Sequence, residues 1–241
     1  MTGLEIKGFV ETSLCDWDGC ISSVVFLPRC NFRCPFCQNG ELILDWEKLP
    51  TVELDTVKAY LAAHSDWIDG VVVTGGEPTL WDDLPSLLET FKGRGMKVKL
   101  DTNGSRPEAV RGLIRKGLVD FIAMDIKAPL DERYNEAAGV KAPLENLKES
   151  IELIQDFGDA YEFRTTLVPG LVGEGEIRLI AEAVEGAGRL VLQRFVPENS
   201  LDNRFRGAVP YQDSFVTRLL EIAGGHVETC FYRGKIGVGL S

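Results

Sequence analysis

The apolar positions of the chain follow two different periods. Short apolar and β-branched runs recur along the sequence, and longer segments with apolar residues at helical spacing lie between them. Near-continuous apolar runs are typical of strands that are buried on both faces of a parallel sheet. Strands are therefore predicted at 22–27, 69–74, 97–100, 119–124, 162–168 and 190–194.

The segments between these strands predict helices. A Ser-x-x-Glu capping box from Ser105 to Glu108 predicts the start of one helix, and Gly117 marks its end. The charges of residues 133–142 show no clean period, so this stretch is expected to be an irregular excursion. Helices are predicted from Thr51 or Glu53 to His64 and at 81–92, 105–117, 143–157, 174–186 and 209–223.

The regular alternation of strands and helices predicts an α/β fold. Six parallel strands with right-handed crossovers can form a partial (β/α)6 barrel, similar to a TIM barrel. Residues 1–21 are expected to hold turns and one strand, and a last strand is predicted at 227–232. Since no second domain is evident, we expect a single domain over residues 1–241, with a core from about 20 to 200 between a short N-terminal segment and a C-terminal helix–strand extension.

Composition limits the class of protein. The chain has 241 residues and a formal net charge of −11, which argues against a nucleic-acid partner because such a partner needs a basic surface. No stretch reaches transmembrane length, and residues 1–7 contain no apolar signal core. We therefore expect a cytoplasmic protein without a membrane partner, in which the six cysteines are metal or catalytic ligands sooner than disulfides.

Three of these cysteines lie in the loop after the first predicted strand. Cys30, Cys34 and Cys37 have C-x3-C-x2-C spacing, so they can reach one inorganic centre together. A [4Fe–4S] cluster normally takes four thiolates, and a site that offers three leaves one iron open for chemistry. A zinc knuckle is the alternative, but it needs a fourth ligand nearby. No histidine lies close, since His64 is in a predicted helix and His226 is far along the chain.

This motif, with aromatic Phe36 before the third thiol, resembles the signature of the radical S-adenosylmethionine (radical SAM) superfamily. The continuation at 37–40 and the lead-in at 8–13 and 16–19 are similar to the small glycyl-radical-enzyme activases, most of all to the type that activates anaerobic ribonucleoside-triphosphate reductase. The resemblance implies a [4Fe–4S] cluster with S-adenosylmethionine at its open iron. It also implies that Phe36 lies against the adenine, whereas a simple place in the core is the other interpretation.

Parallel barrels gather their reactive residues where strands end and loops begin. After the second predicted strand, Gly75-Gly76-Glu77-Pro78 is either a tight turn that starts a helix or a loop whose glycines let the backbone approach a ligand. The stretch is similar to the family's GGEP motif. The resemblance implies that Gly75, Gly76 and Glu77 hold the amino group of the methionine part of the cofactor.

The next two strands also end in polar residues. Asp101 and Thr102 have no evident structural task if Ser105 caps the following helix, and Asp125 and Lys127 leave the neighbouring strand. In the activases the matching loops lie near the methionine carboxylate, which Lys127 would face. In at least one branch they hold a monovalent cation, whose oxygen ligands here would be Asp101, Thr102, the Ala123 carbonyl and Asp125.

Arg164 interrupts the fifth predicted strand, where a charge is costly unless it is paired. It is predicted either to pair with Glu162 or another barrel acid, or to contact the carboxylate or ribose of the cofactor. Gln193 and Arg194 end the sixth strand on opposite faces. The histidine that pyruvate formate-lyase activases carry near this place is absent, and Val196 cannot replace it, which favours the ribonucleotide-reductase branch.

Cys15, Cys20 and Cys230 lie outside the motif. With His226 they could form a zinc site if the two ends of the chain meet, whereas isolated cysteines are more often small buried hydrophobes. The absence of a second cysteine-dense segment argues against enzymes with auxiliary clusters.

The resemblance implies a specific activity. One electron from flavodoxin or ferredoxin would enter the cluster, S-adenosylmethionine would be cleaved to methionine and a 5′-deoxyadenosyl radical, and this radical would take a hydrogen atom from a glycine of a partner such as anaerobic ribonucleotide reductase. Two alternatives stay open. One is a radical SAM enzyme that acts on a small molecule, as carboxy-deazaguanine synthase does, and the other is a non-catalytic iron–sulfur or zinc module.

Overall fold

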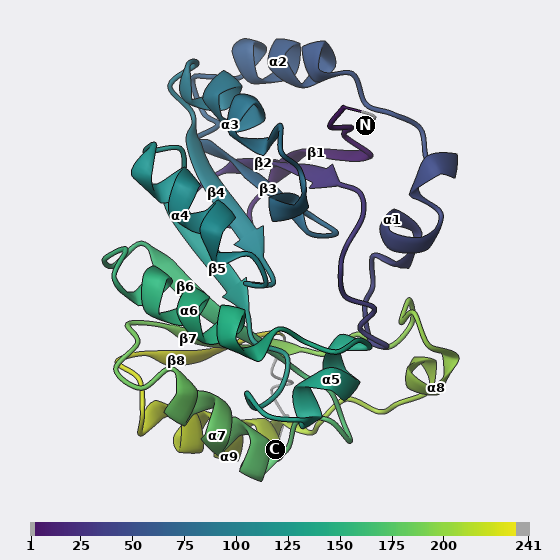
Figure 1. The fold of residues 1–241 in the computed structure, drawn as a ribbon, viewed down its shortest axis with the longest axis vertical. Helices are drawn as coiled ribbons and strands as arrows, with labels where there is room; N and C mark the ends of the chain where they lie inside the picture. Colours follow the sequence, from purple (N-terminus) through teal and green to yellow (C-terminus); the bar gives the residue numbers. More distant parts are fainter. Residues whose placement is uncertain (1–2, 235–241) are drawn as a thin grey trace, which may run out of the picture. The chain divides into compact units, whose positions relative to one another are not determined.

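The computed structural model describes residues 3–234, which form two compact units (Figure 1). The first unit runs to Asn31 and continues over Asn39–Ala123. The second comprises Phe32–Gln38 and the described residues from Met124 onward. The cysteine loop is therefore divided, because Cys30 belongs to the first unit while the other two motif cysteines belong to the second.

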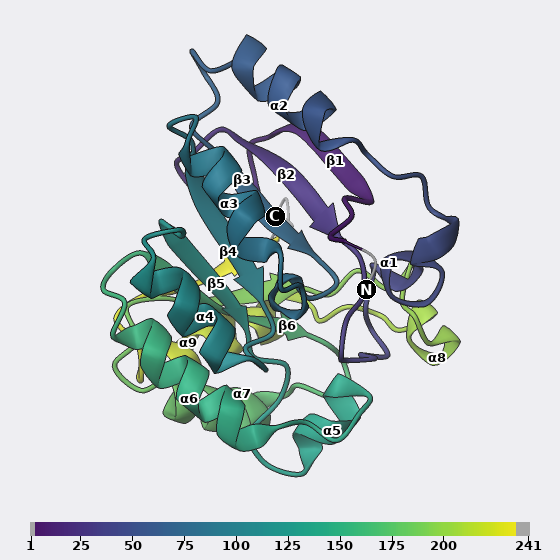
Figure 2. The same ribbon diagram turned by 45° about the horizontal axis from the view of Figure 1, so that its top comes forward.

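The first unit is built on four strands in chain order. β1 (Gly8–Ser13) pairs antiparallel with β2 (Ser22–Leu27), and parallel pairs follow between β2 and β3 (Gly70–Gly75) and between β3 and β4 (Lys97–Thr102). The central valines of β3 are fully buried, as a continuous apolar run requires. Helix α3 packs on β4 (Figure 2). The helices and 3-10 turns of this unit are α1 (Gly40–Leu44), η1 (Trp46–Lys48), α2 (Leu54–Ala63), η2 (Pro78–Leu80), α3 (Leu84–Lys92) and α4 (Pro107–Arg115).

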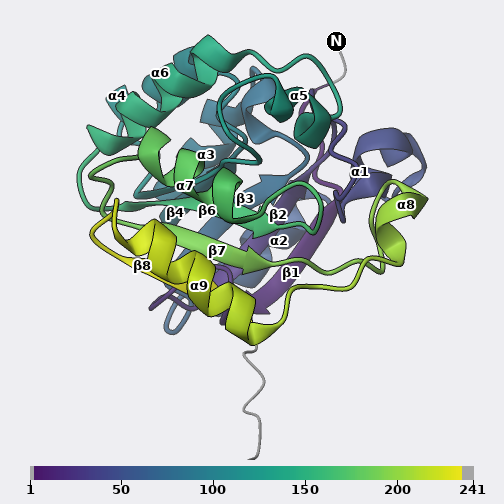
Figure 3. The ribbon, with the colours of Figure 1, turned by 90° about the horizontal axis from the view of Figure 1, so that it is seen from below.

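The second unit has three parallel strands in chain order, β6 (Tyr161–Leu167), β7 (Leu190–Arg194) and β8 (Cys230–Arg233). Strand β5 (Phe121–Asp125) passes from the first unit into the second after Ala123. Helices α7 and α9 pack against each other, and α9 also packs on β8 (Figure 3). The helices of this unit are α5 (Arg133–Ala138), α6 (Leu144–Gln155), α7 (Glu174–Ala183), α8 (Asn203–Arg206) and α9 (Asp213–Gly224).

This architecture confirms the predicted α/β class with a mostly parallel sheet. Strands β2 to β7 are the six predicted strands, and their ends lie within two residues of the predicted ends. Within the described part of the chain, no helix has the length and apolar character needed to span a membrane. The single domain over 1–241 stays a prediction, and its residues 1, 2 and 235–241 lie outside the described residues.

Two local predictions were wrong. The expected irregular excursion contains helix α5, which buries Tyr134, Ala137 and Ala138 on one face and ends at Gly139 with a left-handed φ of 65°. The charged residues of this segment lie outside that apolar face. Because the face has only three residues, it is too short to show a helical period in the sequence.

The capping box before α4 is also absent. The N-cap residue is Arg106, without a side-chain cap, and the first helical residue is Pro107, whose fixed φ suits that position. The hydroxyl of Ser105 instead accepts a hydrogen bond from Asn31 at 2.8 Å. Ser105 therefore has a partner 74 positions away that no local pattern could reveal.

Candidate active site

The glycines after β3 let the GGEP loop reach the segment that leads into the first cysteine. Gly76 N donates to Leu27 O, and Glu77 N donates to Arg29 O, both at 2.8 Å. A Cβ on Gly76 would lie 1.9 Å from Arg29 O, and one on Gly75, which has a φ of 122°, would lie 2.3 Å from Leu27 O. Neither position can carry a side chain in this geometry. The first task of the glycine pair is therefore to fix the start of the cysteine loop.

The Glu77 carboxylate is fully buried and accepts four hydrogen bonds. Its Oε1 accepts from Thr79 N at 3.1 Å, from Thr79 Oγ1 at 2.5 Å and from Thr102 Oγ1 at 2.8 Å, while Oε2 accepts from Asn103 N at 2.6 Å. Burial raises the pKa of Glu77 above its usual value, although these donors offset part of the effect. The side chain ties the end of β3 to the end of β4. Its predicted contact with the cofactor stays a prediction.

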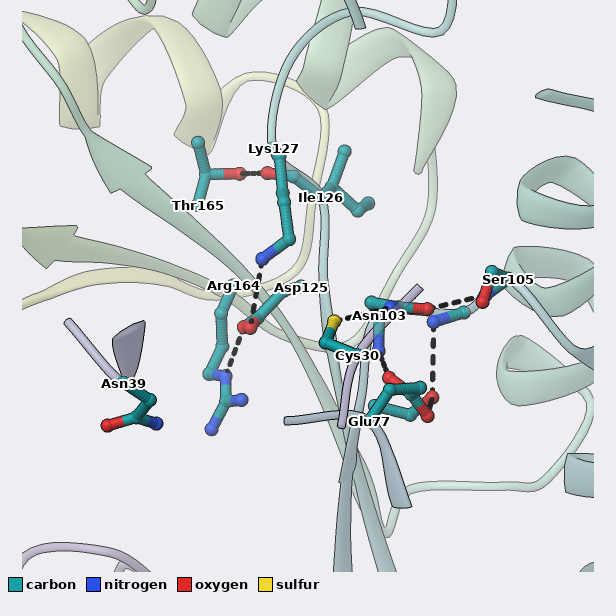
Figure 4. A network of polar contacts seen from close by, with 12 residues as sticks. Cys30, Asn39, Glu77, Asn103, Ser105, Asp125, Ile126, Lys127, Arg164 and Thr165 are labelled. Carbon is teal, nitrogen blue, oxygen red and sulfur yellow. Dashed lines mark hydrogen bonds and ion pairs between the residues drawn. The ribbon is translucent and has the colours of Figure 1, made fainter. Parts of the chain in front are cut away.

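Asn103, which sequence analysis did not select, reaches the first cysteine. Its Nδ2 lies 3.8 Å from Cys30 Sγ and 2.9 Å from Asn31 Oδ1, and its Oδ1 accepts from Ser105 N at 2.9 Å (Figure 4). The only sequence signal was its place beside Asp101 and Thr102 at a strand end. A hydrogen bond to a cysteine 73 positions earlier needs the fold to be seen.

The predicted oxygen ligands on β4 have protein partners. Thr102 Oγ1 donates to Glu77 and accepts from Gly104 N at 3.1 Å. Lys99, which is buried within β4, places its ammonium 3.9 Å from Asp101 Oδ1 and donates to Asp16 O at 2.6 Å. A positive charge thus already lies near Asp101. The monovalent cation stays a prediction.

In the second unit, the rest of the cysteine loop is held by backbone hydrogen bonds. Arg33 N donates to Ala138 O at 2.8 Å, and Gly139 is in close contact with the same turn, because a Cβ there would lie 2.0 Å from Arg33 O. Two further bonds fix the end of the loop: Leu201 N donates to Cys37 O at 3.0 Å and Asp202 N donates to Pro35 O at 2.8 Å. The α5 segment and the segment before α8 therefore both hold the part of the loop that carries Cys34 and Cys37.

Phe36 and Cys34 are also part of this unit, and both side chains are buried. Phe36 is 7% exposed, which agrees with a place in the core and equally with a ligand-facing position next to the cysteines. Its predicted contact with adenine stays a prediction.

Asp125, Lys127 and Arg164 form an ion-pair cluster. Arg164 Nε donates to Asp125 Oδ1 at 2.7 Å, and Lys127 Nζ lies 3.5 Å from Asp125 Oδ2 (Figure 4). Burial would raise the pKa of Asp125, but the two cations lower it below its usual value. Burial would likewise lower the pKa of Lys127, but Asp125 and the Cys34 and Cys37 thiolates raise it. Two cations with one carboxylate give the cluster an excess positive charge.

Arg164 pairs with Asp125 more closely than with Glu162. The Arg164–Glu162 separation is 3.9 Å, whereas Arg233 contacts both oxygens of Glu162, at 3.1 and 2.9 Å. The interpretation of Arg164 as the partner of a barrel acid therefore fits Asp125. Its cofactor contact stays a prediction.

The chemistry of the cysteines fits an iron–sulfur cluster. All six cysteines are free thiols, so Cys30, Cys34 and Cys37 can all act as thiolate ligands. Across residues 3–234, no three His, Cys, Asp or Glu side chains gather so closely that they could hold a single metal ion. In a [4Fe–4S] cluster each thiolate binds an iron of its own, so its ligands need not converge on one point.

Two of the remaining cysteines, Cys20 and Cys230, are partly buried. Cys20 packs against an apolar cluster of Trp17, Val24 and Val72, and burial raises its pKa. Burial raises the pKa of Cys230 to about 12, so its thiol stays protonated at neutral pH. Among the residues 3–234, these cysteines belong to no metal-binding group.

Comparison with known proteins is consistent with this site. The model of the Radical SAM superfamily matches residues 24–182. A protein of Methanocaldococcus jannaschii that is provisionally assigned as a glycyl-radical enzyme activating enzyme is 31% identical over 233 residues, 95% of each chain. The 7-carboxy-7-deazaguanine synthase of Neisseria meningitidis is 30% identical over 113 residues, 47% of each chain.

A solved structure shares the fold. Streptococcus suis SuiB bound to S-adenosylmethionine matches with a TM-score of 0.60 and 15% sequence identity. The match covers 88% of this chain and 48% of SuiB, so the chain spans about half the length of that protein. At this identity the likeness shows the fold alone.

Proposed function

The chain belongs to the radical SAM superfamily, and from this premise we propose that it is a glycyl-radical-enzyme activase, with anaerobic ribonucleotide reductase as the first candidate partner. The observation that carries the proposal is the 31% identity to the Methanocaldococcus jannaschii protein over 95% of both chains. A match over nearly the whole of both chains favours a shared substrate class more than matches that cover half a chain. A cytoplasmic location and a flavodoxin or ferredoxin as reductant are parts of this proposal.

Cys30, Cys34 and Cys37 would hold the [4Fe–4S] cluster. When bound, the cluster would supply the electron for reductive cleavage of S-adenosylmethionine to methionine and a 5′-deoxyadenosyl radical. The hydrogen atom would come from the partner: a glycine Cα–H bond would break and a C–H bond would form at the 5′ carbon. A hydrogen-atom transfer needs no general base, so the two histidines have no task in it.

The residues of the chain would bind and orient the cofactor. Lys127 and Arg164 carry the excess positive charge of their cluster and would bind the methionine carboxylate. The backbone of Gly75 and Gly76 would face the amino group. Because the Glu77 carboxylate already accepts four hydrogen bonds, we assign it the task of holding that loop.

Phe36 would lie against the adenine. Asp101, Thr102 and Asp125 would border the methionine part, with or without a monovalent cation. Measuring the affinity for S-adenosylmethionine in sodium, in potassium and in a bulky organic cation distinguishes a site with a bound cation from one without. Only a bound ion makes this affinity depend on the identity of the cation.

The test of function uses anaerobically reconstituted protein. We expect about four irons per chain, and cleavage of S-adenosylmethionine after reduction with dithionite. With a partner enzyme whose glycines carry deuterium on Cα, deuterium should appear in 5′-deoxyadenosine and a glycyl radical should appear in the EPR spectrum. The variant Cys34→Ser should abolish cleavage, whereas Cys230→Ser, which changes a protonated thiol outside the motif, should keep most of it.

A second candidate function is supported by the 30% identity to 7-carboxy-7-deazaguanine synthase, and it involves a small-molecule substrate. In the same assay, deuterium from the labelled substrate of that enzyme would then reach 5′-deoxyadenosine, and no glycyl radical would form. A protein that binds the cluster but does not cleave S-adenosylmethionine would contradict both functions.

A further inference from the structure

The sulfur of Cys30 has a side-chain amide beside it. Asn103 Nδ2 lies 3.8 Å from Cys30 Sγ and 2.9 Å from Asn31 Oδ1, so one amide hydrogen is available to each of them (Figure 4). Asn103 is only 5% exposed, which keeps water from competing for its hydrogens. Hydrogen bonds to the sulfurs are among the factors that set the reduction potential of an iron–sulfur cluster.

The orientation of the Asn103 amide is fixed by its neighbours. Its Oδ1 accepts from Ser105 N at 2.9 Å. A backbone N–H can only donate, so the oxygen must face Ser105 and the NH2 group must face the cysteine. Asn31 supports the same arrangement, because its Nδ2 donates to Ser105 Oγ at 2.8 Å and its oxygen is left to accept from Asn103.

The backbone of Asn103 is also held in place. Its N–H donates to Glu77 Oε2 at 2.6 Å, and the preceding Thr102 donates to the other oxygen of the same carboxylate at 2.8 Å. Since Glu77 is fully buried, this support belongs to the core of the first unit. The amide donor is thus presented to the sulfur by a rigid loop end.

We propose that Asn103 is a positioning residue for reduction of the cluster: its side-chain amide hydrogen-bonds to the Cys30 thiolate and raises the reduction potential. A hydrogen-bond donor stabilises the reduced cluster more than the oxidised one, because the reduced cluster carries more negative charge on its sulfurs. The inference rests on the cluster part of the proposed function and does not depend on which substrate is used.

The test is a redox titration, followed by EPR, of the full-length protein with its cluster reconstituted. Asn103→Leu removes the donor. Asn103→Asp keeps an acceptor for Ser105 N–H but turns an oxygen toward the sulfur. At the potential that half-reduces the wild type, we expect the ratio of reduced to oxidised cluster to fall about tenfold in the leucine variant, which corresponds to about 59 mV for a one-electron couple. The ratio should fall further in the aspartate variant.

Ser105→Ala is the matched control. It removes the hydroxyl that accepts from Asn31 but keeps the backbone N–H that orients Asn103, so its potential should stay close to that of the wild type. Iron content and the visible spectrum establish that each variant holds an intact cluster. If leucine is poorly tolerated, Asn103→Ala removes the same donor without added volume or charge and gives the comparison with Ser105→Ala.

Three outcomes would overturn the inference while the proposed function stands. Both Asn103 variants could titrate like the wild type. The reduction potential could shift in the aspartate variant alone, which would show that the added charge causes the effect. The potential of Ser105→Ala could shift as far as that of the leucine variant, which would show that displacement of the loop causes it. A wild-type protein that holds no four-iron cluster would instead overturn the proposed function itself, and this inference with it.

Discussion

Two carboxylates at strand ends, one in each unit, are stabilised in opposite ways. Glu77, after β3, is fully buried and accepts four hydrogen bonds from neutral N–H and O–H groups. Asp125, at the end of β5, has a side chain that is 32% exposed and lies between two cations, Arg164 and Lys127. The four donors fill the hydrogen-bonding capacity of the Glu77 carboxylate. The two cations beside Asp125 can each form a further ion pair with a bound ligand.

This difference distinguishes the acid that holds the GGEP loop from the acid of the proposed carboxylate-binding site. Neutral donors that satisfy Glu77 hold the loop in one conformation but offer no net charge to a ligand. Around Asp125, two cations face one carboxylate, so an added carboxylate group would be attracted to the cluster. The following predictions test whether the two acids differ in this way.

The largest effect is expected for Asp125→Ala. The change leaves Arg164, whose side chain is 10% exposed, without its 2.7 Å partner and leaves Lys127 beside it as a like charge. We expect the free energy of unfolding of the apoprotein to fall by about 3 kcal/mol, at the low end for buried pairs because Asp125 is partly exposed. Urea unfolding under anaerobic, reducing conditions measures it.

Asp131→Ala is the control for this variant, because Asp131 also pairs with an arginine, Arg133, but on the surface. It should change the free energy of unfolding very little. Equal losses in the two variants would show that the Asp125 cluster is no more than another surface pair.

Glu77→Gln should have the next largest effect. All four of its partners are donors, so the new NH2 group must face at least one N–H or O–H group, and a buried donor loses its acceptor. We expect a loss of about 2 kcal/mol in the free energy of unfolding. The same substitution at the exposed Glu89 of α3 is the control and should be close to neutral. An unchanged free energy of unfolding in Glu77→Gln would show that the carboxylate does not hold the ends of β3 and β4 together.

Thr102→Val should cost less than Glu77→Gln, about 1.5 kcal/mol, because it removes the hydroxyl that donates to Glu77 and accepts from Gly104 N, with little change in shape. In the Glu77→Gln background the same change should cost less than in the wild type, since the acceptor at Glu77 has already been altered and only the bond from Gly104 N is newly lost. A double-mutant cycle measured by urea unfolding tests this coupling. Additive losses would mean that Thr102 acts independently of the carboxylate.

The smallest effect is a pH dependence of stability, whose direction should be opposite for Asp125 and Glu77. Because Arg164 and Lys127 hold the pKa of Asp125 below the usual value, this group binds a proton less readily in the folded protein than in the unfolded chain. Its stabilising contribution is therefore present above the unfolded pKa and is lost as the pH falls through the folded pKa. Asp125→Asn should flatten the acid side of the stability profile. An unchanged acid side would show that Asp125 is not the group responsible.

The sequence predicts the fold well because the strands carry their own signal. Continuous apolar runs such as Val71–Val73 need burial on both faces, whatever the rest of the chain does. The three motif cysteines are predicted for a similar reason, since their spacing is local. The features that the sequence did not reveal depend on partners far along the chain. Asn103 reaches Cys30 only when β3 and β4 align, and Ser105 bonds to Asn31 in place of capping a helix.

Glu77 illustrates the same limit at a residue that was selected. Sequence pattern marks an acid after a glycine pair, but it does not tell whether neutral donors or cations surround the carboxylate. That distinction follows from the residues opposite the strand end, Thr102 and Asn103, which lie 25 and 26 positions away.

Residues 33–37, which include the second and third motif cysteines, are held by other segments of the second unit. Their backbone is bonded to Ala138, Leu201 and Asp202, and a glycine at 139 makes room for it. Moved into another scaffold as a peptide, the motif would keep its thiols but lose these restraints. A designer who wishes to transplant this chemistry would have to carry over the α5 turn and the segment before α8 as well.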